Sequence, residues 1–292
     1  MSALSHLLCI LALSCAIHAV ASDPAMGTEV KQRIALKSGI SMAYQVAGPE
    51  SNPPMVLLHG LGDTSRSWSL MLPELAKRNR IYIVDLRGHG ETEAPACCYA
   101  LADLGYDVIT FMDAMKIDSA IIGGHSLGSF VGQHLATSYP SRVRGLILIG
   151  SADTTVDNEA VEWLWAQTLT FEKAPPPAFV DEWQSNPTPV NAEFIAKVKT
   201  ETAEVPLHVW TSVARTLLTA DSRRFIGEFK SPAMILWGEK DPMFQSASRE
   251  RLRQLLPHAE FKVYPNLGHN PHWESPELVA GDIDAFVRST AE

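Results

Sequence analysis

The feature that most constrains this chain is an apolar run that leads directly into the pattern Gly-x-Ser-x-Gly at residues 120–128. The run is rich in β-branched residues, as in a buried strand, and residues 127–139 have helical composition. A strand that passes straight into a helix must turn sharply, and glycines two positions to either side of Ser126 let the two backbones pass without a Cβ clash. The bare pattern also occurs by chance in ordinary turns. The strand before it and the helix after it favour Ser126 as a nucleophile.

Strand-like and helix-like segments alternate along most of the chain. Strands are predicted over residues 31–36, 41–47, 55–58, 81–85, the run before Ser126, 143–149, 233–237 and 260–264, and helices over 68–77, 101–115, 127–139 and 276–288. Short, fully apolar strands separated by helices indicate a parallel sheet with helices on both faces. The predicted fold class is therefore α/β, with a mostly parallel, eight-stranded sheet.

The alternation of strands and helices is interrupted between residues 153 and 229. The segment has no convincing strand, and its amphipathic helical stretches are broken by proline-rich sequences at 173–177 and 186–189. We expect one sheet domain, formed by residues 22–152 and 230–292, with a helical insertion over 153–229.

Residues 1–21 are predicted to be a secretory signal peptide. Residues 7–20 are almost entirely apolar and too short to span a bilayer, and the small-x-small pattern Ala-Val-Ala ends at Ala21. The start of the segment has no Lys or Arg, which departs from the usual pattern. Cys15 allows a lipid-anchored alternative, although Ala12 stands where such a motif usually has Leu. We expect cleavage near Ala21 and export to the periplasm or the medium; an uncleaved anchor or a misread start is the remaining alternative.

The cysteines give little support for a disulfide framework. Cys9 and Cys15 lie in the predicted signal peptide, and Cys97 and Cys98 are adjacent, so no long-range disulfide can form within the mature chain. An oxidising compartment permits a vicinal disulfide or an intermolecular bridge. Two reduced, half-buried thiols are the simpler expectation.

Charge and composition exclude several kinds of partner. The formal net charge is −9 and there is no long basic run, which argues against nucleic acid and against stable association with a membrane after signal cleavage. Pairs of His or Cys at ligand spacing do not occur with a third and fourth ligand, so neither a metal nor another cofactor is predicted. Oligomeric state leaves no signal in the sequence.

Several motifs occur in an order that resembles the α/β-hydrolase superfamily, in particular its capped, serine esterase and lactonase-like members. Residues 57–62 (LLHGLG) match the loop after the third strand, and residues 85–90 (DLRGHG) resemble the turn after the fourth. Residues 237–242 (WGEKDP) and 266–269 (NLGH) resemble the acid and histidine loops, and residues 270–276 continue the likeness. The resemblance implies a helical cap inserted after the sixth strand.

The resemblance places the general base at His269, on a Gly-flanked loop after the last strand. An imidazole can accept the serine proton at neutral pH because its unperturbed pKa is near 6.5. Of the other histidines, His125 should point to the other side of the turn, His59 and His89 belong to turn motifs, and His272 should aim elsewhere.

A carboxylate must hold that imidazole in the useful tautomer. Asp241 follows the seventh predicted strand, and the order Ser126, Asp241, His269 is the one expected for this fold. Asp153, after the sixth strand, is the alternative, because some relatives use that position. Otherwise, Asp153 would cap a helix at the start of the insertion.

An oxyanion needs backbone donors that are already in place. Leu127, directly after the nucleophile, should supply one N–H, and the resemblance implies that Leu61 supplies the other. His59, Asp85 and Arg87 are expected to support these loops.

The reaction class follows from residue types, and the substrate does not. We expect hydrolysis of a carboxylic ester or lactone of a hydrophobic small molecule. Ser126 argues against a dehalogenase or epoxide hydrolase, which would have Asp there; a carbon–carbon bond hydrolase and a non-catalytic binding protein remain alternatives. The four tryptophans of the insertion are expected to line a largely apolar pocket; they are Trp163, Trp165, Trp183 and Trp210.

Overall fold

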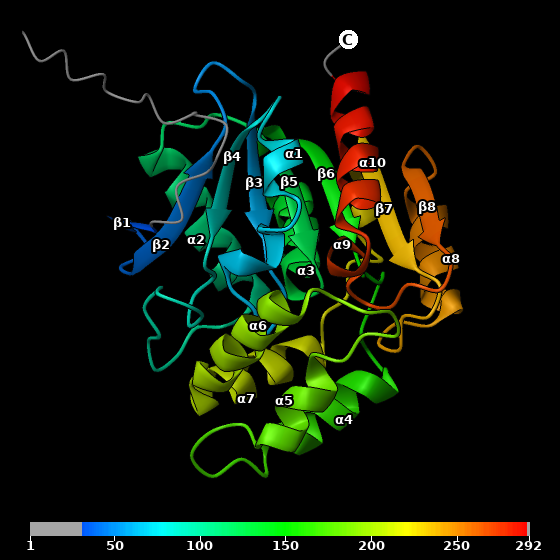
Figure 1. Ribbon diagram of the computed structural model, residues 1–292. Coiled ribbons are helices and arrows are strands. Elements are labelled where there is room, and N and C mark those ends of the chain that lie inside the picture. Colours follow the sequence, from blue (N-terminus) through cyan, green and yellow to red (C-terminus); the bar gives the residue numbers. More distant parts are fainter. Residues whose placement is uncertain (1–30, 291–292) are drawn as a thin grey trace, which may run out of the picture.

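The computed structural model describes residues 31–290, which form a single eight-stranded sheet with helices on both faces (Figure 1). The strands are β1 (Gln32–Ala35), β2 (Ser41–Ala47), β3 (Pro54–Leu58), β4 (Arg80–Val84), β5 (Ala120–His125), β6 (Val143–Ile149), β7 (Ala233–Gly238) and β8 (Glu260–Tyr264). Their order in the sheet is β1-β2-β4-β3-β5-β6-β7-β8. Strand β2 is antiparallel to both its neighbours, and all other pairs are parallel. The predicted fold class is confirmed.

Two hydrophobic cores lie on opposite faces of the sheet. Helices α2 (Leu101–Ala114), α3 (Leu127–Ser138) and α8 (Ser246–Leu255) pack on one face, and α1 (Leu72–Leu75) and α10 (Pro276–Ser289) pack on the other. The short α9 (Pro271–Glu274) precedes α10, and single 3₁₀ turns occur at Ser65–Trp68, Pro140–Arg142 and Ile226–Glu228. No helix within residues 31–290 is both long and apolar enough to cross a membrane.

Two predictions about helices on the sheet faces are wrong. Residues 68–77 do not form one helix: a 3₁₀ turn ends at Trp68 and α1 begins at Leu72. Pro73 lies in the first turn of α1, where its missing N–H costs nothing, whereas in a helix begun earlier its ring would clash with the preceding turn. Helix α8 was not expected. Its sequence is strongly polar, and Leu252 is its only buried residue, so it offers few apolar positions from which a helix could be predicted.

Four helices lie between β6 and β7 and cover the carboxyl ends of the strands (Figure 1). They are α4 (Glu159–Thr168), α5 (Pro177–Trp183), α6 (Ala192–Glu204) and α7 (Leu207–Leu217); we call them the cap helices. Aromatic rings hold α4, α5 and α7 together: Phe179 stacks between Trp163 and Trp183, at 5.8 Å between centroids on each side, and meets Trp210 edge-on. The predicted insertion thus contains the helices expected there and no named strand.

The adjacent cysteines differ from the simpler expectation. Cys97 and Cys98 are joined by a disulfide and are exposed on the loop between β4 and α2, rather than being reduced and half-buried. The neighbouring Tyr99 is buried against the cap, and its backbone carbonyl oxygen accepts a hydrogen bond from Thr216 of α7 at 3.0 Å. The predicted signal peptide, residues 1–21, lies outside the described residues.

Candidate active site

Ser126 lies at the tip of the turn between β5 and α3. Its backbone has φ 49° and ψ −117°, a conformation that costs a non-glycine residue about 1–3 kcal/mol and that clusters at functional sites. The flanking glycines make the turn possible: a Cβ on Gly124 would lie 2.2 Å from the Gly128 carbonyl oxygen, and one on Gly128 would lie 2.3 Å from the Leu58 carbonyl oxygen. The two glycines of the sequence pattern therefore permit the sharp strand-to-helix turn that was predicted at Ser126.

His269 and Asp241 meet across the carboxyl ends of β7 and β8. The Nδ1 of His269 lies 2.9 Å from Oδ2 of Asp241, whose side chain is fully buried. The other oxygen, Oδ1, accepts backbone N–H groups of Met243 at 2.8 Å and Phe244 at 3.3 Å, which fixes the carboxylate. Because Asp241 accepts, Nδ1 carries the hydrogen and Nε2 is left as the basic nitrogen. Within residues 31–290 this Nε2 is buried and has no hydrogen-bond partner.

Asp153, the alternative acid, is engaged elsewhere. Its buried carboxylate binds the guanidinium of Arg251 on α8, with N–O distances of 2.8 and 3.2 Å. Asp153 lies just before the cap helices, and this ion pair holds α8 against that segment.

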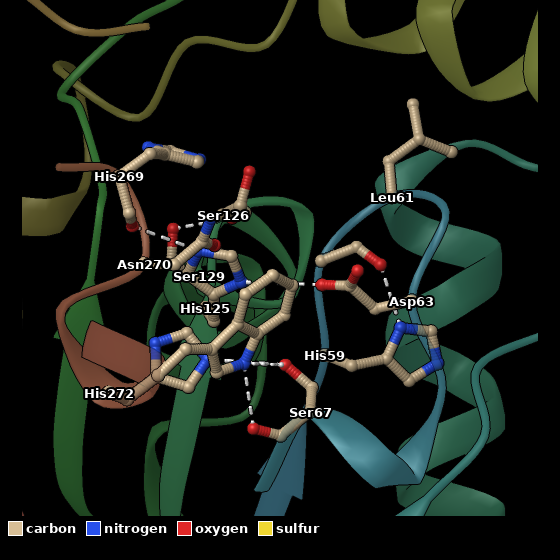
Figure 2. Close-up of polar contacts among 12 residues, drawn as sticks. His59, Leu61, Asp63, Ser67, His125, Ser126, Ser129, His269, Asn270 and His272 are labelled. Carbon is tan, nitrogen blue, oxygen red and sulfur yellow. Dashed lines mark hydrogen bonds and ion pairs between the residues drawn. The ribbon is translucent and has the colours of Figure 1, made fainter. Parts of the chain in front are cut away.

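The other histidines near the site have structural contacts and lowered basicity. His59 lies under the loop after β3: its Nδ1 donates to the Gly60 carbonyl oxygen at 2.7 Å, and its Nε2 accepts the Leu86 N–H at 2.9 Å. Ser67 Oγ lies 3.2 Å from Nε2 of His272, which therefore points away from the nucleophile (Figure 2). Burial lowers the pKa of both histidines, and that of His272 falls well below the usual value.

The two amides expected to form an oxyanion hole lie at the start of α3 and on the loop after β3. Neither the Leu61 nor the Leu127 N–H donates to a backbone carbonyl within the described part of the chain. The Gly128 N–H donates to the His59 carbonyl oxygen at 3.1 Å and ties the two segments together. Both amides are thus free of backbone acceptors in this part of the chain, and the Gly128–His59 bond holds the loop of Leu61 against the start of α3.

The cap contacts both loops of the site. Trp183 of α5 donates its indole N–H to the Leu61 carbonyl oxygen at 3.0 Å. On the other side, Glu274 accepts the Gly268 N–H at 2.7 Å and also the Thr188 N–H of the cap segment at 3.2 Å. The cap therefore fixes the positions of the oxyanion loop, residues 59–63, and of the histidine loop, residues 266–270.

A cavity of about 350 Å³ lies between the cap and the strand ends, and both Ser126 and His269 line it. The apolar residues of its lining, which we call the apolar wall, are Leu61, Ala160, Trp163, Trp183, Pro242 and Met243. The polar residues, which we call the polar wall, are Asp63, His125, Gln184, Ser185 and Asn270, and Glu182 also lines the cavity. Most of the lining surface is apolar, as the sequence led us to expect, with polar side chains among it.

Only two of the four predicted tryptophans line this cavity. Trp163 and Trp183 do; Trp165 and Trp210 do not, which corrects the prediction for them. Trp165 follows Trp163 by two positions on α4, about 200° around the helix, so the two indoles cannot share a face. Trp210 is fully buried behind Trp183, edge-on at 5.6 Å between ring centroids.

The polar wall was not predicted. Gln184 of the cap donates to Oδ1 of Asp63 at 3.0 Å, a pairing across 121 positions of sequence. Asp63 follows the H-G-x-G motif by one residue, which was the only local signal for it. No sequence pattern marks Gln184.

The comparisons with known proteins agree with this architecture. The family model described as "Alpha/beta hydrolase family" matches residues 55–282. The dihydrolipoyllysine-residue acetyltransferase component of the acetoin cleaving system from Pseudomonas putida is 29% identical over 82% of this chain, which spans 65% of that relative's length. Epoxide hydrolase 4 from Mus musculus is 26% identical over 91% of this chain and 81% of its own.

Among solved structures, the enol-lactonase from Burkholderia xenovorans LB400 superposes with a TM-score of 0.78. The two are 23% identical, over 88% of this chain and all of the other, which shows a shared fold. The family model covers both the turn at Ser126 and the loop of His269, and the mostly parallel, eight-stranded sheet is the one expected from the sequence. The chain belongs to the alpha/beta hydrolase family.

Proposed function

We propose that this protein is a serine hydrolase that cleaves a carboxylic ester or lactone of a hydrophobic small molecule through an acyl-enzyme intermediate. The observation that carries the proposal is the His269–Asp241 hydrogen bond, which leaves Nε2 without a partner within residues 31–290 on a residue that lines the same cavity as Ser126. In this scheme, Nε2 takes the Ser126 proton as Oγ attacks the carbonyl carbon, and then returns it to the leaving oxygen.

Backbone donors would stabilise the negative charge that develops on the carbonyl oxygen. The Leu61 and Leu127 amides are the candidates, since neither is used by a backbone carbonyl within residues 31–290. In other enzymes, loss of one such donor costs about 10²- to 10³-fold in kcat. Water then attacks the acyl-enzyme, with Nε2 again as the base.

The residue at the turn distinguishes this proposal from epoxide hydrolysis, even though an epoxide hydrolase is among the relatives. An enzyme of that class would have Asp where this chain has Ser126. Carbon–carbon bond hydrolysis uses the same three residue types, so only measurement separates it from ester hydrolysis. The cavity volume of about 350 Å³ suits a small ester, since ligand pockets commonly span roughly 300–1,000 Å³.

A hydrolysis panel tests the proposal. It compares acetate esters, bulky aromatic esters, long-chain esters and lactones. It also includes a 1,5-diketone as a substrate for carbon–carbon bond hydrolysis. We expect the highest kcat/KM for a bulky aromatic ester or a lactone. Turnover of the diketone alone would support the alternative reaction, and binding without turnover of any member would support a non-catalytic binding protein.

The apolar wall should set part of this preference. Trp163→Ala should raise KM for the bulky ester about tenfold and leave acetate esters nearly unaffected, because only a large group reaches the indole. Trp165→Ala is the matched control: the same change on the same helix, outside the cavity. Equal effects of the two substitutions would show that the wall does not determine specificity.

A further inference from the structure

Two buried groups, one at the end of the oxyanion loop and one beneath it, have no role in the proposed reaction. His125 and Asp63 are 2% and 4% exposed. The Nδ1 of His125 lies 3.7 Å from Oδ2 of Asp63, and its Nε2 lies 3.2 Å from the backbone carbonyl oxygen of His269 (Figure 2). The second carboxylate oxygen, Oδ1, accepts from Gln184. The imidazole of His125 thus lies between two oxygen atoms.

Neither neutral tautomer of His125 satisfies both neighbours when Asp63 is ionised. A backbone carbonyl oxygen only accepts, so a bond to His269 requires hydrogen on Nε2, and Nδ1 is then a lone pair facing a carboxylate oxygen. With hydrogen on Nδ1, the bare Nε2 faces the carbonyl oxygen instead. Each arrangement leaves two acceptors facing each other in a buried site, where an unsatisfied polar group is costly.

The missing donor cannot come from solvent. Nδ1 of His125 is buried and has no hydrogen-bond partner within residues 31–290. The backbone of Gly60 covers the gap: a Cβ there would lie 2.9 Å from both Asp63 Oδ2 and His125 Nδ1. The remaining source is a proton that the two residues hold between them.

The negative charge of Asp63 favours keeping this proton. With it, the pair carries no net charge; without it, the pair is a largely buried negative charge, which is unfavourable. Burial lowers the pKa of His125, and the adjacent Asp63 opposes that shift. The proton therefore belongs to the pair and not to either residue alone.

Other titratable groups surround the pair. His269 and His272 face His125 with ring centroids at 5.0 and 4.5 Å. The remaining neighbours act on Asp63 or line the same cavity: His59, His89 and Glu182. Several of these groups are neutral histidines. They do not balance the negative charge that the His125–Asp63 pair carries once its proton is lost.

We propose that His125 and Asp63 share one proton through neutral pH and so keep negative charge away from the oxyanion loop. The inference rests on the proposed function, because the Gly60–Leu61 peptide over the pair carries the amide assigned to the oxyanion. Loss of the proton puts a negative charge beside the one that develops in the transition state, and kcat/KM falls. Both are positioning residues, since they act through this loop.

The substitution Asp63→Asn tests the role of the proton. An amide at this position donates to Nδ1 of His125 and accepts from Gln184 without any added proton. The parent should lose activity at alkaline pH by about tenfold or more, and Asp63→Asn should lose this alkaline decrease and keep any decrease at acidic pH. Asp284→Asn is the control: this buried carboxylate on α10 binds Arg78 at 2.8 Å, and its replacement should leave both decreases in place.

A second measurement needs no substrate. In the ¹⁵N-labelled parent, the ring resonances of His125 should titrate with the same midpoint as the alkaline decrease in kcat/KM. A folded Asp63→Asn enzyme with the parental alkaline decrease would overturn the proposal, as would a parent without any alkaline decrease. If Asp63→Asn does not fold, ring resonances that stay constant across that pH range overturn it. An enzyme that hydrolyses no ester at any pH would contradict the proposed function instead, and the ring titration would still decide whether the proton is shared.

Discussion

The indole N–H of Trp183 donates to the backbone carbonyl oxygen of Leu61 at 3.0 Å. One residue of the cap thus holds the same peptide segment whose N–H is proposed to bind the oxyanion. In the proposed function, a side chain that lines the cavity and also orients this loop would link substrate binding to catalysis.

Trp183→Phe should therefore lower kcat more than it raises KM. Phenylalanine keeps most of the apolar contact and removes only the N–H, so the loop loses one restraint. We expect a decrease in kcat on the order of tenfold, less than the loss of an oxyanion donor itself. Trp165→Phe, outside the cavity, serves as the control. An unchanged kcat in folded Trp183→Phe would show that the hydrogen bond does not position the loop.

Asp241→Asn should reduce kcat by about 10⁴-fold, because an amide stabilises the wrong tautomer of His269 and does not balance the imidazolium. Asp153→Asn is matched in chemistry and removes the ion pair with Arg251. It should leave kcat within a few-fold of the parent. Steady-state kinetics of both variants at one pH separates the two candidate acids, and the reverse pattern would reassign the acid to Asp153.

Buried histidines should make the protein less stable in acid. Burial lowers the pKa of His89 to about 3, whereas the unfolded chain binds a proton near 6.5. Between these values the unfolded state holds more protons, so the free energy of unfolding falls as pH falls, by about 1.4 kcal/mol per pH unit for each such group. His89→Asn should remove one such contribution from urea denaturation measured as a function of pH. The exposed His258, changed to Asn, should leave the slope as it is; equal slopes in parent and His89→Asn would contradict the assignment.

The signal peptide is a separate prediction. If residues 1–21 direct export, protein recovered from its native host should begin within a few residues of Ser22 and lie outside the cytoplasm. Mass spectrometry of the N-terminal peptide in each cell fraction tests this. An intact Met1 on protein from the cytoplasmic fraction would refute it.

Features that a few consecutive residues determine could be predicted from the sequence. Contacts between residues far apart in the chain could not. The strand, turn and helix around Ser126 follow from a few consecutive residues, and the order of motifs placed Asp241 and His269. The pairing of Asp63 with Gln184 has no local signal because the partners lie 121 positions apart. Which face of α4 meets the cavity depends on how the helix is rotated, so Trp163 and Trp165 could not be told apart from composition.

The central claim is that Ser126 is the nucleophile, and covalent trapping tests it most directly. A chromogenic phosphonate ester reacts with an activated serine and stays bound as a stable analogue of the tetrahedral intermediate. Peptide mapping by mass spectrometry should find one adduct per chain, on Ser126, formed in step with the loss of esterase activity and absent from folded Ser126→Ala. An adduct on another residue that accounts for the lost activity, or parental ester turnover by Ser126→Ala, would contradict the account.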